Sequence, residues 1–376
     1  MENPNDAPLN GVLSDLRTQI DDADGQLLEL LNRRARLSLE VGRVKARMGI
    51  PIYRPKREEA LLQRLADANE GPMRNEHLMA VYREILSASR DLQRTLHVAY
   101  LGPEGTFSSV ACLEYFGHSI AGEAMPGLAD VFEAVARRDC EFGIVPLENS
   151  VYGTVGDTLD LFAASDVHIV AEWISRIRLS LLSKETSLAD VRTVYSHSQP
   201  LGQCAAWLRA NTPSARQVSV ESTAAAGRRA AREKGAAAVG HAVLAERLDL
   251  SVLASGIEDS ADNKTRFFIV GPGPYKDEGK STEKSSIVFA TADKPGSLAA
   301  VLGILAAAGL NMSKLESRPM RGEQWKYLFF ADLDSDITAF PDVLGAMREH
   351  CLRLRVLGAY AAASAENAPQ SKEQQS

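Results

Sequence analysis

The stretch EDSADNKTRFFIV, residues 258–270, reads as a polar loop that runs into a buried strand. Asn263 is a turn former, and the apolar run 267–270 has the length of a strand. Thr265 and Arg266 lie at the junction, where a rigid strand can present a hydroxyl and a guanidinium to a cleft. These residues alone favour a simpler interpretation, in which Thr265 caps a turn and Arg266 is a surface charge.

Composition and charge limit the protein class. The chain has 376 residues, enough for two or three domains, and carries a net charge of −7, which argues against nucleic-acid and anionic-membrane surfaces. Its four cysteines are far apart and form no CxxC pair, so we expect neither zinc nor disulfides, but thiols in a reducing cytoplasm. The polar N-terminus and the short apolar run 299–310 predict a soluble cytoplasmic protein.

The first segment predicts helices. Apolar residues from Leu13 to Met48 recur every three or four positions, so we expect one amphipathic helix about 50 Å long. A domain of this size cannot cover such a helix alone, and a partner chain is the expected cover. Two further helices are expected from Pro55 and from Asn75, separated by Gly71-Pro72.

Two cations interrupt the apolar face of the long helix. Arg34 stands where the spacing requires an apolar residue, and Lys45 follows eleven residues later on nearly the same face. Ser89 and Gln93 occupy the matching face of the third helix. The cations either extend to solvent or meet an anion in the helical core, and the pattern favours neither alternative.

Strands and helices alternate in the middle of the chain, which predicts an α/β domain. Ligand-binding side chains in such domains gather where strands end. A glycine-rich turn after the strand 97–101 contains Thr106, which can cap a helix, and it lacks a nucleotide-binding pattern. The polar residues expected at two other strand ends are Glu148, Asn149, Ser150, His197, Ser198 and Gln199.

The C-terminal part begins after a polar linker, 273–284. Its expected order of elements over 285–363 is βαββαβ, which is ferredoxin-like. Residues 364–376 are expected to form a disordered tail.

Residues 8–96 resemble the helical chorismate mutases, an intertwined dimeric family that rearranges chorismate to prephenate. The resemblance rests on LSDLRTQID, LLNRRARLSLEVGRVK, PIYRPKREE and SASRDLQ. It implies catalytic roles for Lys45, Gln93 and Glu58, and chorismate binding by Arg34, Arg57, Ser89 and a partner chain's Arg17. Arg17 and Arg34 are about 25 Å apart along one helix, so they can share a small ligand only if one comes from another copy. Arg54 departs from the acidic residue that some members carry.

Residues 97–272 resemble prephenate dehydratase, whose two α/β lobes are similar in plan to periplasmic binding proteins. The matching blocks are GPEGTFS, VPLENSVYGTV, YSHSQPLGQC and NKTRF. The resemblance implies that Thr265 is the catalytic hydroxyl, and Glu148 and His197 both remain open as the proton source. The residues implied for prephenate binding are Thr106, Glu148, Asn149, Ser150, Ser198, Gln199 and Arg266.

Residues 285–363 resemble the ACT domain of enzymes that phenylalanine inhibits, through DKPGSLAAVLGIL, GLNMSKLESRP and WKYLFFADLD. The resemblance implies that phenylalanine binds between two such domains. The implied effector residues are Gly296, Leu298, Asn311, Met312, Glu316, Ser317 and Arg318.

Together the segments predict a bifunctional enzyme of phenylalanine biosynthesis that converts chorismate through prephenate to phenylpyruvate. We expect a homodimer or a dimer of dimers, without a metal or cofactor. One alternative is a mutase fused to prephenate dehydrogenase, which would require a dinucleotide fingerprint where the chain has GPEGTFS. The other is a phenylalanine-sensing protein whose two-lobed domain is inactive.

Overall fold

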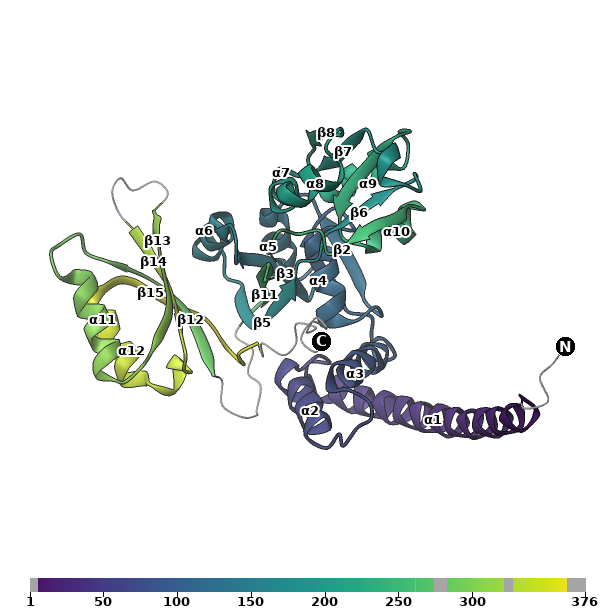
Figure 1. Cartoon of the computed structure of the whole chain (residues 1–376). Helices are drawn as coiled ribbons and strands as arrows, with labels where there is room; N and C mark the ends of the chain where they lie inside the picture. The colour runs from purple at the N-terminus through teal and green to yellow at the C-terminus, as the bar shows by residue number, and fades with distance from the viewer. Residues whose placement is uncertain (1–5, 261, 274–282, 321–326, 364–376) are drawn as a thin grey trace.

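The structure is a computed structural model that describes residues 6–260, 262–273, 283–320 and 327–363, with the side chains of 6–9 and 56 left out. Figure 1 shows a helical domain, a two-lobed domain and a C-terminal domain in chain order. The predicted tail 364–376 and most of the predicted linker 273–284 lie outside the described residues.

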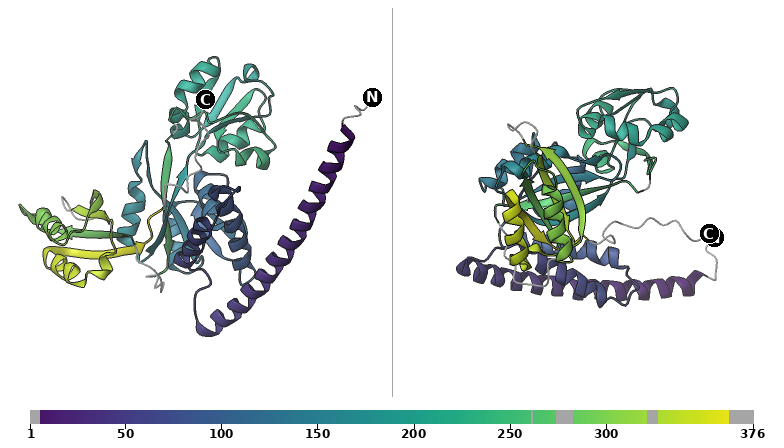
Figure 2. Two further views of the ribbon diagram at one scale, coloured as in Figure 1. Left: turned by 60° about the horizontal axis from the view of Figure 1, so that its bottom comes forward. Right: turned by 90° about the vertical axis from the view of Figure 1, so that its left-hand side faces the viewer.

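The helical domain consists of α1 (Asp6–Met48), α2 (Pro55–Asp67) and α3 (Asn75–Asp91), which confirms the three predicted helices. Gly49 follows α1 with a φ of 65°, a conformation that glycine adopts readily at a helix end. Pro55 lies in the first turn of α2, where an N–H would have no intrahelical partner. The side chains of residues 10–30 are all exposed, and this half of α1 projects away from the molecule (Figures 1 and 2).

The first lobe of the middle domain has a mixed sheet in the order β2-β1-β3-β11-β5, with β4 paired to β3. Its strands are β1 (His97–Leu101), β2 (Ala121–Met125), β3 (Phe142–Asn149), β4 (Gly153–Thr154), β5 (His168–Arg176) and β11 (Lys264–Gly271). Its helices are α4 (Phe107–Phe116), α5 (Leu128–Ala136) and α6 (Gly156–Ala164).

The second lobe has a sheet in the order β10-β6-β9-β7-β8. Its strands are β6 (Ser180–Ser183), β7 (Thr193–Ser196), β8 (Arg216–Ser219), β9 (Ala236–Gly240) and β10 (Ser251–Ser255). Its helices are α7 (Ser198–Gln203), α8 (Ala205–Asn211), α9 (Thr223–Ala230) and α10 (Val243–Leu248), with a 3-10 turn at Leu188–Asp190. The chain leaves the first lobe after β5 and returns in β11, so the predicted two-lobed α/β fold is confirmed.

Strand β11 begins earlier than the apolar run predicted. Thr265 and Arg266 lie within the strand and not at a junction between loop and strand. Strand β11 pairs with β3 on one side and with β5 on the other. Successive side chains of a strand point to opposite faces of the sheet. Thr265 and Arg266 therefore face different sides of the lobe.

The C-terminal domain has the predicted βαββαβ order and an antiparallel sheet ordered β13-β14-β12-β15. Its elements are β12 (Lys284–Thr291), α11 (Ser297–Ala307), β13 (Met312–Pro319), β14 (Tyr327–Leu333), a 3-10 turn (Ile337–Ala339), α12 (Pro341–His350) and β15 (Cys351–Tyr360).

One hydrophobic core joins the C-terminal domain to the first lobe. Val288, Phe330 and Leu357 of the C-terminal sheet belong to the same buried cluster as Phe162 and Phe268 of the lobe. Strand β15 passes so close to β5 that a Cβ on Gly358 would overlap the backbone carbonyl of Ile169. The two domains thus pack as one body, without room for a side chain at this crossing.

We predict that Gly358→Ala destabilises the docked C-terminal domain by about 1–3 kcal/mol, because backbone at a packed interface must move to admit the methyl group. Thermal unfolding and limited proteolysis between the two domains would measure the effect. Gly345→Ala is the matched control, since nothing lies within 4 Å of its Cβ and alanine favours the helix α12 by up to about 1 kcal/mol. Equal unfolding temperatures for the two variants would contradict the prediction.

Candidate active sites

A pocket of about 410 Å³ opens between α1, α2 and α3. It brings together six of the residues that were predicted to bind or rearrange chorismate: Arg34, Lys45, Arg57, Glu58, Ser89 and Gln93. Arg54, Arg64 and Arg90 also line it. Its many cations and single carboxylate suit a ligand with more than one negative charge.

Hydrogen bonds arrange the polar face of this pocket. Arg34 donates to the Ser89 hydroxyl, which in turn donates to the Ile85 carbonyl at 2.6 Å. Lys45 Nζ donates to the Ile52 carbonyl at 2.6 Å, and Gln93 Nε2 donates to the Ser89 carbonyl at 3.0 Å. Gln93 Oε1 is buried without a hydrogen-bond partner in the described part of the chain, so the amide retains bonding capacity toward the pocket.

Arg90 is a site residue that the sequence analysis missed. Its side chain is almost fully buried, forms an ion pair with Glu58 and donates to the backbone carbonyl of Phe116 in the first lobe. The guanidinium also stacks over the ring of Tyr53, 5.1 Å from its centroid. Because α3 is amphipathic, Arg90 reads in sequence as an ordinary basic residue of its last turn, and only the tertiary structure shows the link to Glu58.

Arg17 is not part of this pocket. It lies on the exposed N-terminal half of α1 and does not line the pocket of its own chain. This position agrees with the prediction that Arg17 serves another copy, which the single chain leaves untested.

A second polar site surrounds Thr265 at the end of β11. Asn149 Nδ2 donates to Thr265 Oγ1 at 2.9 Å and to Asn263 Oδ1 at 2.9 Å. The Ser150 hydroxyl donates to the Asp262 carbonyl at 3.0 Å. Asn149, Ser150 and Thr265, predicted from separate motifs, therefore lie together.

The hydrogen bonds around Asn149 fix the orientation of Asn263. Asn149 Oδ1 accepts from the backbone N–H groups of Val151 and Tyr152, so its Nδ2 must face Asn263. Asn263 then accepts through Oδ1, which leaves Nδ2 as a donor. That nitrogen is buried and has no partner within the described residues, although the sequence indicated only a turn former. A buried donor without a partner calls for an explanation, and an acceptor atom of a bound ligand is one such explanation.

The second lobe contributes residues at the start of α7. Its helical N-cap is His197, and Ser198 and Gln199 form the first turn. The Tyr152 hydroxyl of the first lobe reaches across to the Gln199 carbonyl at 3.1 Å. Thr106 caps α4, as predicted, and accepts from the Ser109 N–H at 3.4 Å. Among the described residues, neither Thr106 nor Ser198 forms a hydrogen bond with Thr265.

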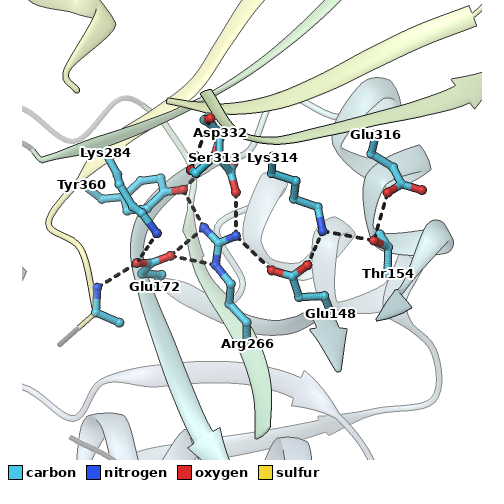
Figure 3. Close-up of polar contacts among 12 residues, drawn as sticks. Glu148, Thr154, Glu172, Arg266, Lys284, Ser313, Lys314, Glu316, Asp332 and Tyr360 are labelled. Carbon is cyan, nitrogen blue, oxygen red and sulfur yellow. Dashed lines mark hydrogen bonds and ion pairs between the residues drawn. The ribbon is translucent and has the colours of Figure 1, made fainter. Parts of the chain in front are cut away.

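Glu148 and Arg266 face away from Thr265, toward the C-terminal domain (Figure 3). Arg266 pairs with Glu172 and Glu148 of its own lobe and with Asp332 of β14, the last at 2.5 Å. Glu148 also forms an ion pair with Lys314 of β13. This geometry corrects the expectation that both residues line the prephenate cleft, because strand alternation turns them to the opposite face of the sheet.

The electrostatics of these two residues agree with the geometry. Burial raises the pKa of Glu148, but the hydrogen bond and charge of Lys314 and the charge of Arg266 outweigh it and hold the pKa below the ordinary value. Burial likewise lowers the pKa of Arg266, and Asp332, Tyr360 and Glu172 raise it well above the ordinary value. Glu148 is therefore an ionised partner in this network and a poor proton donor.

The residues predicted to bind phenylalanine lie in two places in the C-terminal domain, at the start of α11 and along β13 with the residue before it. Gly296 caps α11 in the left-handed conformation, Leu298 packs on the domain core, and Asn311 donates to Asp334 at 2.6 Å. Met312 starts β13, and Ser317 is exposed on that edge strand. Glu316 and Arg318 instead meet Thr154 and Asp160 of the first lobe. The last two thus contact this chain's own lobe, where an interface between two C-terminal domains was expected.

Nowhere in the described ranges do three or more His, Cys, Asp or Glu side chains group closely enough to hold a metal ion. Of the described helices, none has the length and apolar character that a bilayer span requires.

Comparison with known proteins matches each domain. Three family models fit the chain: chorismate mutase type II at residues 16–94, prephenate dehydratase at 98–274 and the ACT domain at 285–349. Over 354 residues the chain is 39% identical to the bifunctional chorismate mutase/prephenate dehydratase of Aquifex aeolicus (strain VF5), covering 93% of this chain and 97% of the relative.

Two solved structures resemble most of the chain. The prephenate dehydratase of Arthrobacter aurescens in complex with L-Phe has a TM-score of 0.67 at 28% identity, covering 74% of this chain and 94% of that one. A protein described as a novel type of quorum-quenching acylase has a TM-score of 0.65 at 26% identity, covering 72% and 98%.

We predict that the contribution of Glu148 to stability depends on pH. A carboxylate whose pKa is lowered on folding stabilises the folded state above its unfolded pKa, near 4.5, and this stabilisation is lost as the pH falls through the folded value. The melting temperatures of wild type and Glu148→Gln should therefore differ most near neutral pH and converge as the pH falls below 4.5 and through the lowered pKa of the folded state. A difference that stays constant from acid to neutral pH would show that the Glu148 ion pairs do not contribute.

Proposed function

The chain belongs to the family of bifunctional chorismate mutases/prephenate dehydratases, and we propose how its residues divide the two reactions. The helical domain rearranges chorismate to prephenate, and the two-lobed domain converts prephenate to phenylpyruvate. The observation that carries the residue-level proposal is the pocket of about 410 Å³, which is lined by six of the residues that the sequence resemblance implied.

In the mutase pocket, Arg34 and Arg57 are proposed to hold the substrate carboxylates, while Glu58 accepts from the substrate hydroxyl. The rearrangement breaks a C–O bond and forms a C–C bond without a nucleophile or a proton transfer. Lys45 and the second Nε2 hydrogen of Gln93, the one that does not bond the Ser89 carbonyl, would donate to the ether oxygen, where negative charge develops. Holding chorismate in its compact conformer provides the rest of the rate enhancement.

In the dehydratase site, the Thr265 hydroxyl is proposed to donate to the leaving oxygen of prephenate. Asn149 donates to Thr265 Oγ1, so the hydroxyl accepts this bond and keeps its own hydrogen for donation. The unpaired Nδ2 of Asn263, whose Oδ1 accepts from the same Asn149 nitrogen, is proposed as a second donor. Loss of carbon dioxide and the hydroxyl makes the ring aromatic, and His197 on the facing lobe is the remaining candidate proton source.

Phenylalanine is proposed as the feedback inhibitor of this enzyme. Support comes from the ACT domain and from the relative that was solved with L-Phe. The proposed contacts are Gly296, Leu298, Asn311, Met312 and Ser317.

We also propose a cytoplasmic location, supported by the dispersed free cysteines and testable by cell fractionation.

A time course with purified protein and chorismate, with and without phenylalanine, tests the proposed function. We expect prephenate and then phenylpyruvate to form without an added cofactor, and phenylalanine to suppress phenylpyruvate. Accumulation of prephenate alone would mean that the two-lobed domain is inactive.

A substitution in one of the two sites should abolish its reaction and leave the other reaction intact. We predict that Thr265→Ala abolishes phenylpyruvate formation and spares the mutase, that Asn263→Ala acts in the same direction, and that Lys45→Ala does the reverse. The loss expected for removing one such donor is about 100-fold or more in kcat. Asp262→Ala is the control for Asn263, because only its backbone carbonyl has a role in the site. Loss of both activities in a folded single variant would argue against separate sites.

We propose that a second copy of the chain covers α1 and completes the mutase site. Leu13, Leu16, Ile20 and Leu27 are each at least half exposed on α1, a pattern that a second amphipathic helix would bury. Light scattering should therefore report a dimer or a larger assembly of dimers.

A complementation experiment tests the role of Arg17. Arg17→Ala and Arg34→Ala should each lose mutase activity, whereas co-expressed subunits should recover about a quarter of it, since random pairing leaves one intact site in half of the dimers. Absence of recovery, with mixed dimers present, would place both residues in one chain's site.

A further inference from the structure

Thr265 and Asn149 lie next to residues that the ACT domain holds. On β11 the neighbour of Thr265 is Arg266, and on β3 the neighbour of Asn149 is Glu148. Both neighbours point to the opposite face of the sheet, where the ACT sheet packs (Figure 3). A change in the contacts of either side chain therefore acts on backbone next to a proposed catalytic group.

Arg266 anchors β11 to the ACT sheet. Its Nη1 lies 2.5 Å from Asp332 Oδ2, and its Nη2 donates to the Tyr360 hydroxyl at 3.3 Å. Asp332 and Tyr360 are themselves joined through the buried Ser286 hydroxyl, at 2.5 and 2.6 Å. Within the first lobe, Arg266 Nε donates a hydrogen bond to Glu172 Oε2 at 2.7 Å.

Lys314 makes the corresponding link to β3. It pairs with Glu148 and donates to Thr154 Oγ1 at 3.1 Å, so it binds both β3 and its short partner β4. In the sequence, Lys314 lies between two groups of residues that are proposed to contact phenylalanine. Asn311 and Met312 come before it, where β13 begins, and Ser317 comes after it on the same strand. A shift of β13 on effector binding would therefore act directly on Glu148.

The contacts are strong enough to transmit such a shift. Asp332, Glu172 and Arg266 are largely buried, with side-chain exposures of 7%, 1% and 11%. Separating buried, paired charges leaves each uncompensated, so the partners move together. The pairing of β3 with β11 is irregular between Arg266 and Phe267, and such irregularities often lie where a strand end is re-aimed beside an active site.

We propose that Arg266, Glu148, Asp332 and Lys314, called the Arg266 cluster, are positioning residues for the dehydratase reaction. Through them β13 and β14 of the ACT domain set the positions of Thr265 and Asn149. The same contacts transmit the effect of bound phenylalanine, and this part of the inference rests on the proposed feedback inhibition.

Two substitutions in the full-length enzyme test the cluster. Asp332→Asn removes a carboxylate from Arg266 with little change in shape, and Lys314→Met removes the ammonium from Glu148. Arg353→Ala is the control, because Arg353 bridges the same two domains through the Ala163 carbonyl at 2.9 Å, without contacting the cluster. For each protein one measures melting temperature, both activities, and phenylalanine affinity by calorimetry.

We expect Asp332→Asn to lower the dehydratase kcat about tenfold with little change in KM, and to leave mutase activity intact. Lys314→Met should raise the phenylalanine concentration for half-inhibition about tenfold, while phenylalanine still binds. If both variants match Arg353→Ala in kcat and in inhibition, the inference is wrong.

The two parts of the inference can be separated. A wild-type enzyme that phenylalanine does not inhibit would contradict the proposed regulation and the transmission role of Lys314. The kcat of Asp332→Asn would still decide whether the cluster positions Thr265. Melting temperatures near that of Arg353→Ala would show that any loss of kcat does not come from unfolding.

Discussion

The alternation of side chains along β11 is the constraint on which the catalytic and regulatory parts of the dehydratase both depend. A single strand, hydrogen-bonded on both edges, places a hydroxyl on one face and a guanidinium on the other. On the face with Thr265, the Asn149 amide of β3 donates both to the Thr265 hydroxyl and to Asn263 of the preceding loop. The face with Arg266 meets carboxylates from two domains. Neither arrangement survives a shift of one residue in register, since every side chain would then change face.

A comparable arrangement connects the mutase pocket to the first lobe. Arg90 holds Glu58 with one nitrogen and the lobe's Phe116 carbonyl with another. Tyr53, from the connection between α1 and α2, packs against Phe116 and Phe142 of the lobe, with ring centroids 5.5 and 5.1 Å away. The mutase pocket is therefore supported by contacts with the dehydratase lobe as well as by its own helices. Fusion of the two domains therefore supports the structure of the mutase pocket. It also keeps the dehydratase, which consumes the mutase product prephenate, on the same chain.

The sequence predicted most of the architecture because its signals are local. Apolar spacing defined α1 to α3, and alternation of elements indicated the two-lobed fold and the βαββαβ order. Motif resemblance also identified Asn149, Ser150 and Thr265, which the structure brings together. The resemblance also implied that Glu148 and Arg266 line the prephenate cleft, and this expectation was wrong. The position of a residue in a motif does not show which face of a strand its side chain occupies. Arg90 and Asn263 were missed since burial and an unsatisfied donor arise only from tertiary contacts.

The shared hydrophobic core has a consequence for how this enzyme could escape inhibition during evolution. Phe162 and Phe268 of the lobe are covered by Phe330 and Leu357 of the ACT domain. A nonsense mutation that removed the regulatory domain would uncover this apolar surface and favour aggregation. Strains selected for overproduction of phenylalanine should therefore carry substitutions in a full-length chain rather than truncations. The ACT domain is therefore part of the scaffold of the first lobe as well as a regulator.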